Sequence, residues 1–177
     1  MNKLSGKTCY LIGAIDRAND LGTAWRSEIQ VTLKDRFGVN VYNPLEKPID
    51  IGIEDAASRE RRKLLKKSKH FAEFAEEIKL IRRVDLRMVD KADFLICYID
   101  LDVFMCGTFE ECSLANRQKK PVIIFCKQGV ENIPDWLFGM LPYQLFFNNA
   151  EEVIQYLESI DNGTNTEYLN RWLFFDR

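Results

Sequence analysis

Four acidic residues stand close together in the second half of the chain, in a pattern that suits chemistry better than packing. Asp100 and Asp102 follow an apolar stretch, and Glu110 and Glu111 come next, in the segment "GTFEECSLA". Carboxylates gathered in one place repel each other, so stability alone would scatter them. Together they can stabilise a positive charge, attack an electrophilic carbon or move a proton.

The two glutamates are expected in the first turn of a helix over 109–118, with Thr108 as its N-cap. A carboxylate there faces the positive end of the helix dipole and unpaired N–H groups, so Glu111 is predicted to stay ionised near neutral pH. Glu111 would also be the third helical residue, where a glutamate can simply complete a capping box. Glu110 is expected to point to solvent or to pair with a neighbouring cation.

Size and composition bound the class of protein. The chain has 177 residues, 46% hydrophobic and 29% charged, which predicts one domain, 1–177, with a sizeable core. The formal net charge of −2 attracts neither nucleic acid nor a membrane surface, so neither partner is expected. No apolar run approaches the roughly 18 to 20 residues that span a bilayer. The first apolar stretch is too short for a secretion signal, so a cytoplasmic protein is expected.

The cysteines and the single histidine argue against disulfides and metals. The five cysteines are odd in number, and none stands in a CxxC pair. We interpret them as small buried residues in a reducing compartment, with a reactive thiol at Cys106 or Cys112 as the alternative. His70, the only histidine, lies in a charged stretch, so neither a histidine-based metal site nor a histidine triad is expected.

Short apolar runs alternate with amphipathic stretches, which predicts an α/β fold: a doubly wound parallel sheet of about five strands. In the first helix Trp25, Ile29 and Leu33 recur at four-residue spacing on one face. Strands are expected at 8–15, 39–44, 92–99, 121–126 and 143–147, and helices at 23–37, 109–118 and 150–160.

Two segments depart from this alternation. Residues 46–83 form a charged helical insertion between the second and third strands, and within 58–70 seven of thirteen residues are Arg or Lys. The insertion is either a solvated excursion or a lid whose cations meet a substrate phosphate, and nucleic-acid binding is the weakest of its three interpretations. The aromatic C-terminal tail, 164–177, is expected to pack on its own domain or on another subunit.

Small and acidic residues follow several of the predicted strands. In an open parallel sheet, ligands bind beyond the carboxyl ends of the strands. We therefore expect these residues to converge on one substrate-binding mouth. The candidates are Gly13, Ala14 and Asp16 after the first strand, and Asp100, Asp102, Gly107 and Thr108 after the third.

Several motifs carry a resemblance to a known family. They are "YLIGAID" (10–16), "WRSE" (25–28), "RRVDL" (82–86), "ADFLICYIDLD" (92–102), and "GTFEECSLA" followed by "KPV" (107–122). In this order they resemble the nucleoside 2-deoxyribosyltransferase family and the related deoxynucleoside 5'-monophosphate N-glycosidases, over about Tyr10 to Val122. The resemblance implies a Rossmann-like, flavodoxin-type sheet, a homo-oligomer, and chemistry that needs no metal or organic cofactor.

The resemblance also implies roles for particular residues. Glu111 would be the nucleophile that attacks the anomeric carbon of a 2-deoxyribosyl group, and Tyr10 would orient it. Asp85 would handle the proton on the base, for which it would need a raised pKa. Retaining glycosidases likewise use one carboxyl group as nucleophile and a second to transfer the proton. Asp93, at the start of the third strand, would be structural.

The residues alone leave simpler roles open. Asp85 could pair with Arg82 or Arg83 in the same helix, and Tyr10 could be an ordinary core aromatic. Asp102 could be a surface loop acid.

One departure from the family pattern concerns the sugar. Met105 occupies the position, two residues before the glycine, where the family commonly has an acid that contacts the sugar hydroxyls. Asp100 or Asp102 could reach those hydroxyls from the longer loop. Ala14 stands where a proline is often found, a milder change. The resemblance therefore leaves two hypotheses. The first is an enzyme that cleaves the N-glycosidic bond, and the second is a non-catalytic module that senses a nucleotide in the same pocket.

The predicted partners are a deoxynucleoside or deoxynucleotide and a free nucleobase. Arg59, Arg62 or Lys66 of the insertion could recognise a phosphate. The segment 133–147 is a candidate for contact with a second subunit, with Trp136 either as its anchor or as a core residue.

Overall fold

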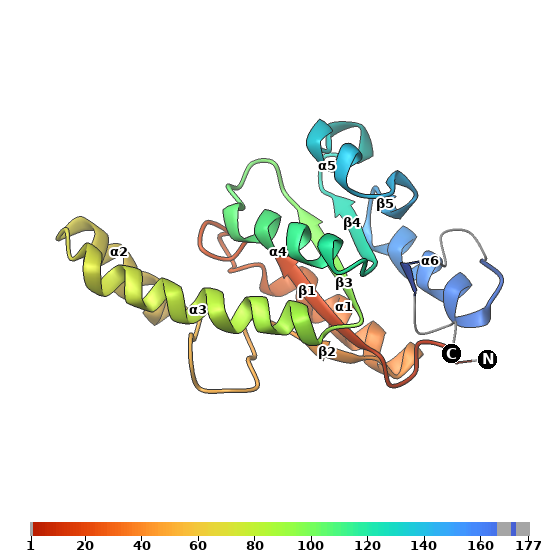
Figure 1. The fold of residues 1–177 in the computed structure, drawn as a ribbon, viewed down its shortest axis with the longest axis horizontal. Coiled ribbons are helices and arrows are strands. Elements are labelled where there is room, and N and C mark those ends of the chain that lie inside the picture. The colour runs from red at the N-terminus through yellow and green to blue at the C-terminus, as the bar shows by residue number, and fades with distance from the viewer. Residues whose placement is uncertain (1, 166–170, 173–177) are drawn as a thin grey trace.

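The structure, a computed structural model, describes residues 2–165, 171 and 172, and its centre is a five-stranded parallel sheet (Figure 1). The strands are β1 (Thr8–Gly13), β2 (Asn40–Tyr42), β3 (Phe94–Ile99), β4 (Val122–Cys126) and β5 (Phe146–Phe147). Their order is β2-β1-β3-β4-β5, and all four pairings are parallel. This is the flavodoxin-type order, whose topological switch point lies between β1 and β3. The predicted fold class is confirmed.

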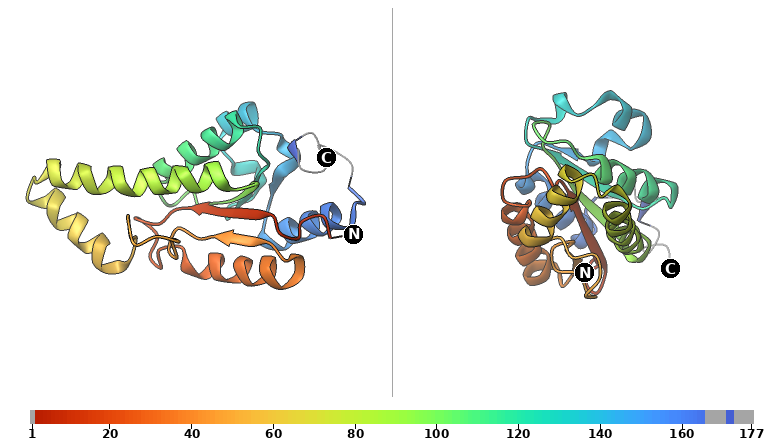
Figure 2. Two further views of the ribbon diagram at one scale, coloured as in Figure 1. Left: turned by 60° about the horizontal axis from the view of Figure 1, so that its bottom comes forward. Right: turned by 90° about the vertical axis from the view of Figure 1, so that its left-hand side faces the viewer.

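Helices cover both faces of the sheet (Figure 2). The α-helices of the described chain are α1 (Thr23–Phe37), α2 (Ala56–Lys67), α3 (Phe71–Lys91), α4 (Cys106–Arg117), α5 (Asp135–Met140) and α6 (Ala150–Asn162). The buried hydrophobic residues of α1 and α6 belong to one cluster, and those of α3 and α4 belong to another. Among the described helices, none is both long enough and apolar enough to cross a bilayer.

The alternation of β1 decides which side chains face which layer. Cys9 and Leu11 join the cluster on the α1 side, while Tyr10 and Ile12 join the cluster on the α3 and α4 side. Because successive side chains of a strand point to opposite faces, the hydroxyl of Tyr10 is carried toward α4. All four side chains are buried.

Some predicted boundaries are wrong. α1 has the predicted bounds, and Gly38 follows it in the left-handed conformation that ends helices. The strand expected at 143–147 is a 3₁₀ turn, Tyr143–Leu145, followed by only two strand residues. α4 begins at Cys106 instead of residue 109.

The charged insertion is helical, as predicted, but its predicted end at residue 83 lies inside α3. α2 and α3 form an antiparallel pair that projects past the carboxyl ends of the strands (Figure 2). The pair therefore overhangs the edge of the sheet where ligands of this fold bind.

Most of the aromatic C-terminal tail lies outside the described residues. Trp172 is described and fully buried, with its ring centroid 5.1 Å from that of Phe94. Its indole N–H donates to the Tyr156 hydroxyl at 2.9 Å. At Trp172, the chain packs on its own domain.

Candidate active site

A pocket of about 310 Å³ lies at the switch point, between the ends of β1 and β3 and the start of α4. Its volume is within the range of small-molecule sites. Its polar and small lining residues include Tyr10, Gly13, Ala14, Asp16, Arg26, Glu54, Asp85, Gly107, Thr108 and Glu111. Eight of the ten residues named as site candidates from the sequence are among them.

Tyr10 and Glu111 meet at the base of this pocket. The Tyr10 hydroxyl donates a hydrogen bond of 2.7 Å to Oε1 of Glu111. Tyr10 is fully buried, and Glu111 is only 8% exposed although it lines the cavity. One oxygen of Glu111 is thus fixed by a rigid strand residue, which restricts the rotation of the carboxyl group.

The local setting of Glu111 differs from the prediction. Because α4 begins at Cys106, Thr108 lies inside the helix and is not its N-cap, and Glu111 falls in the second turn, where no capping box is formed. Burial raises the pKa of Glu111 to about 8, and the nearby Asp85 and Glu54 carboxyls add to the shift. The Tyr10 hydrogen bond and the Arg26 charge only partly oppose it. The prediction that Glu111 is ionised near neutral pH is therefore wrong for the unliganded protein.

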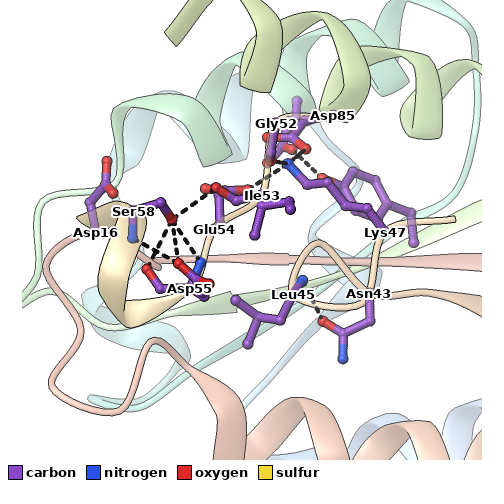
Figure 3. Close-up of polar contacts among 12 residues, drawn as sticks. Asp16, Asn43, Leu45, Lys47, Gly52, Ile53, Glu54, Asp55, Ser58 and Asp85 are labelled. Carbon is purple, nitrogen blue, oxygen red and sulfur yellow. Dashed lines mark hydrogen bonds and ion pairs between the residues drawn. The ribbon is translucent and has the colours of Figure 1, made fainter. Parts of the chain in front are cut away.

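Asp85 is held by a lysine that was not predicted. Nζ of Lys47 lies 2.8 Å from Oδ1 of Asp85 and 2.8 Å from Oε2 of Glu54, and it donates to the Gly52 carbonyl oxygen at 2.6 Å (Figure 3). The Lys47 side chain is 3% exposed and that of Asp85 is 15% exposed. The alternative that Asp85 pairs with an arginine of its own helix does not hold for Arg82, which binds Glu110.

Burial controls the protonation of this pair of acids. It raises the pKa of Glu54 to about 7, with the Asp85 charge adding and the Lys47 charge opposing. It also raises the pKa of Asp85, again against the pull of Lys47, in the direction that a proton donor requires. Three carboxyl groups with raised pKa values, Glu54, Asp85 and Glu111, therefore line one pocket.

Arg26, part of the "WRSE" motif, shapes the loop between β1 and α1. Its side chain is fully buried, and it donates to the carbonyl oxygens of Gly13 at 2.8 Å, Gly22 at 3.0 Å and Leu21 at 3.2 Å. Burial lowers the pKa of Arg26 to about 10, so it remains a cation at neutral pH. Its charge favours the ionised forms of Glu111 and Asp85.

The first loop is held close to its neighbours. A Cβ atom on Gly13 would lie 2.9 Å from the Trp25 ring and 3.1 Å from the Tyr98 carbonyl oxygen, so only glycine fits there without a shift. Asp16, at the outer end of the loop, forms an ion pair of 3.0 Å with the buried Arg62. The insertion therefore contacts the mouth of the pocket directly.

Two predicted substrate contacts lie elsewhere. Asp100 and Asp102 both turn toward the loop after β4, where Lys127 Nζ lies 3.0 Å and 3.2 Å from their carboxylates. Gln128 donates to both as well, at 3.0 Å and 3.2 Å. Neither acid lines the pocket of Glu111. Both line a separate cavity beside Trp25 and Tyr98, and Asp102 also lines a larger cavity next to the pocket. The wall at the family's acidic position is the buried side chain of Met105.

The remaining candidates have plain structural surroundings. All five cysteines are free, and only Cys106 is exposed. Cys97 and Cys112 lie side by side in the core, with sulfur atoms 3.7 Å apart. Asp93 accepts the Thr8 N–H at 2.7 Å, which fits its predicted structural role. Within the described part of the chain, no three His, Cys, Asp or Glu side chains are grouped to hold a metal ion.

Sequence reasoning missed Lys47, Glu54 and the packing of Arg26. The first two lie in the charged insertion, where many residues of the same types are exposed. The available signal was weak: Arg26 stood in a quoted motif without a role, and Lys47 follows the second strand closely.

Comparison with solved structures supports the fold. The 2-deoxyribosyltransferase of Bacillus psychrosaccharolyticus superposes with a TM-score of 0.59 at 20% sequence identity, covering 83% of this chain and 90% of that one. The CMP N-glycosidase of Clostridium botulinum gives a TM-score of 0.47 at 16% identity, covering 87% and 99%. No family model and no curated protein sequence matches the chain. The likeness to the 2-deoxyribosyltransferase agrees with the flavodoxin-type α/β fold seen in the strand order.

Proposed function

We propose that the protein cleaves the N-glycosidic bond of 2'-deoxynucleosides or their 5'-monophosphates through a covalent ester on Glu111. The observation that carries this proposal is the Tyr10–Glu111 hydrogen bond of 2.7 Å at the base of a pocket that also holds Asp85 and Glu54. The fold shared with a 2-deoxyribosyltransferase supports it. No cofactor is needed for this chemistry.

The reaction is a double displacement at C1' of the sugar. The ionised Glu111 oxygen bonds to C1' as the C1'–N bond breaks, and the bonding electron pair leaves with the base. Asp85, in contact with Lys47, supplies the proton that neutralises the departing base. A second nucleobase or a water molecule then attacks C1' and releases the glutamate, which gives transfer or hydrolysis respectively.

Whether the pocket can react depends on which of its carboxyl groups carries the proton. Because the pKa of Glu111 is about 8, most unliganded molecules at pH 7 carry a proton on the nucleophile. The reactive form has that proton on the Asp85 and Glu54 side of the pocket instead. The Tyr10 hydrogen bond and the Arg26 charge both favour an ionised Glu111, and so favour this form.

The test is release or exchange of base from each of the four deoxynucleosides and their 5'-monophosphates, with and without free base. Glu111→Ala should abolish turnover, and mass spectrometry of the wild type should detect a deoxyribosyl adduct on the peptide that contains Glu111. The matched control is Glu110→Ala, because Glu110 is the adjacent acid but is exposed and paired with Arg82. Turnover that survives in Glu111→Ala would remove the proposed nucleophile.

The second candidate function is a module that binds a nucleotide without cleaving it. Met105 in place of an acid and a largely protonated Glu111 favour it. It predicts saturable binding of a nucleotide to the wild type with no base release from any of the eight compounds.

We also propose that the protein is a homo-oligomer that uses the segment 133–147. Trp136 is 85% exposed, so the alternative of a core residue is wrong. Phe138 and Tyr143 in the same segment are exposed too. Large exposed aromatics grouped in one segment are typical of contact surfaces. Sedimentation of the wild type and of Trp136→Ala tests this proposal.

A further inference from the structure

A second cavity adjoins the proposed active site and differs from it in size and charge. It has a volume of about 1010 Å³, against about 310 Å³ for the pocket of Glu111. The two cavities share Asp16, Arg17, Lys66 and Phe104 as walls, so they are continuous at the rim. A substrate seated on Glu111 can therefore extend past that rim beneath α2. This larger cavity is called the cationic cleft below.

The basic residues that line the cationic cleft outnumber the carboxylates that pair with them. Its basic residues are Arg17, Arg59, Arg62, Lys63, Lys66 and Lys67. Arg62 is paired with Asp16 and Lys63 with Glu60. Within the described residues, the other four cations have no carboxylate within ion-pair distance. The second acid of the cleft, Asp102, is paired with Lys127.

Repulsion between like charges within α2 is a cost that a bound anion would lower. Arg59 and Lys63, Arg62 and Lys66, and Lys63 and Lys67 are like-charged pairs four residues apart on α2. Such pairs destabilise a helix, and here the Asp55 capping box and the position of Lys66 and Lys67 in the last turn offset part of that cost. The buried Nε of Arg59 also has no hydrogen-bond partner. An anionic ligand in the cleft would relieve the repulsion.

The amount of charge points to the kind of anion. One phosphate monoester carries at most about two negative charges, whereas four cations of the cleft have no carboxylate partner. Of these, Arg59 donates to the Ala18 carbonyl oxygen and Lys66 lies over the Phe74 ring, which leaves their charge without a counter-ion. Phe104, which is 75% exposed on the shared rim, offers a flat apolar surface beside them. We infer, on the basis of the proposed function, that the substrate carries a chain of two or more phosphates on its 5' side, and that the cationic cleft binds this chain. The preferred donor is then a deoxynucleoside di- or triphosphate or a pyrophosphate-linked dinucleotide, and the nucleosides and monophosphates of the proposed function are weaker substrates of the same site.

The first experiment measures anion binding without turnover. Isothermal titration at fixed ionic strength uses inorganic orthophosphate, pyrophosphate and tripolyphosphate as probes. We expect tripolyphosphate to bind at least tenfold more tightly than orthophosphate, and Lys67→Ala and Arg17→Ala each to weaken it at least fivefold. Lys67 and Arg17 are exposed, so these variants should fold. The matched control is Lys79→Ala, an exposed lysine of α3 outside the cleft that is paired with Glu76.

The outcomes separate this inference from the proposed function. Equal affinity for the three anions, or an equal loss in Lys79→Ala, would overturn the inference whether or not the protein cleaves nucleosides. Conversely, preferential binding of tripolyphosphate that depends on Lys67 would support the cationic cleft as a phosphate-chain site even if no base were released. A single-stranded 20-nucleotide DNA that bound more tightly than tripolyphosphate, with the same dependence on Lys67, would overturn it in favour of a nucleic-acid surface.

The second experiment identifies the source of the phosphate chain. Base release is compared for deoxynucleoside mono-, di- and triphosphates and for a pyrophosphate-linked dinucleotide of the same base. We expect kcat/KM to exceed that of the monophosphate at least tenfold for one of the longer substrates, and Lys67→Ala to reduce this ratio. A preference for the dinucleotide over the triphosphate would assign the Phe104 rim to the second base. A monophosphate preferred over all three would contradict the inference.

Discussion

Glu111→Gln should make the protein more stable while abolishing its activity. The pKa of Glu111 is about 8 in the folded chain, against an ordinary value of 4.5, because the carboxyl group is buried. A tenfold change in proton affinity corresponds to about 1.4 kcal/mol. The ionised side chain therefore costs the folded state about 5 kcal/mol above pH 8, and the cost at pH 7 is about 3 kcal/mol. Glutamine has nearly the same shape, never ionises, and can still accept the Tyr10 hydrogen bond.

The dependence on pH makes this prediction specific. A raised folded-state pKa means that the contribution of Glu111 to stability is fully present below pH 4.5 and is lost as pH rises toward 8. Wild type and Glu111→Gln should therefore have similar free energies of unfolding at pH 4. The variant should be more stable by about 3 kcal/mol at pH 7 and by about 5 kcal/mol above pH 8.

Urea denaturation followed by circular dichroism between pH 4 and pH 9 measures this difference. The m-value should be the same in the two proteins, because the surface exposed on unfolding is unchanged. Glu110→Gln is the control, since the pKa of Glu110 is lowered by its contact with Arg82. If the stability of wild type and Glu111→Gln differed by a constant amount at every pH, the burial of an ionisable Glu111 would be refuted.

Three further predictions follow from the same contacts. The plot of kcat/KM for base release against pH should be bell-shaped, with its maximum between the pKa of about 7 at Glu54 and that of about 8 at Glu111. The reason is that one proton must remain in the pocket for the reaction. A flat profile from pH 6 to 9 would contradict this prediction. Lys47→Met should destabilise the protein by about 3 kcal/mol or more at pH 8 and less at pH 5, because the pKa of Glu54, about 7, leaves that carboxyl group protonated at pH 5, while the exposed Lys79→Met changes little; urea unfolding at the two pH values checks it. Gly22→Ala should cost about 2 kcal/mol or more, because Gly22 has φ +71° and a Cβ would lie 2.7 Å from the Ala14 carbonyl oxygen. Thermal unfolding compares it with Gly139→Ala, where the added Cβ meets nothing within 4 Å, and an equal loss in both would contradict the strain.

The order of elements could be predicted because each depends on local pattern. α1 was bounded correctly, since its apolar spacing is regular and Gly22 and Gly38 flank it. Apolar spacing and flanking glycines lie within one short stretch of sequence, so they can be recognised without a structure. The pairing of Tyr10 with Glu111, which are 101 positions apart, was implied only by the family resemblance.

The protonation of the site could not be predicted in the same way. The expectation for Glu111 assumed that Thr108 is the N-cap of a helix that begins at residue 109, whereas the pKa of Glu111 is raised mainly by burial. The contact of Asp100 with Lys127 joins residues 27 positions apart, and nothing local to either residue specifies it. Burial and long-range ion pairs arise only when the chain packs. The periodicity and spacing of residues in the sequence therefore cannot predict them.

The charged insertion contributes residues both to the pocket of Glu111 and to the cationic cleft. It supplies Glu54 to the lining of the pocket, Lys47 as the ion-pair partner of Glu54 and Asp85, and the cations of α2 to the cationic cleft. The sheet and α4 place Glu111, the proposed nucleophile, at the switch point, whereas we expect the insertion to set where protons reside and which anions bind. Substrate choice in this protein is therefore expected to follow the insertion more than the core. Variants of Lys47 should alter the pH profile, and variants of Lys67 should alter the preference for phosphate number. If either variant changed both properties together, the insertion would act as one unit rather than as two separate sites.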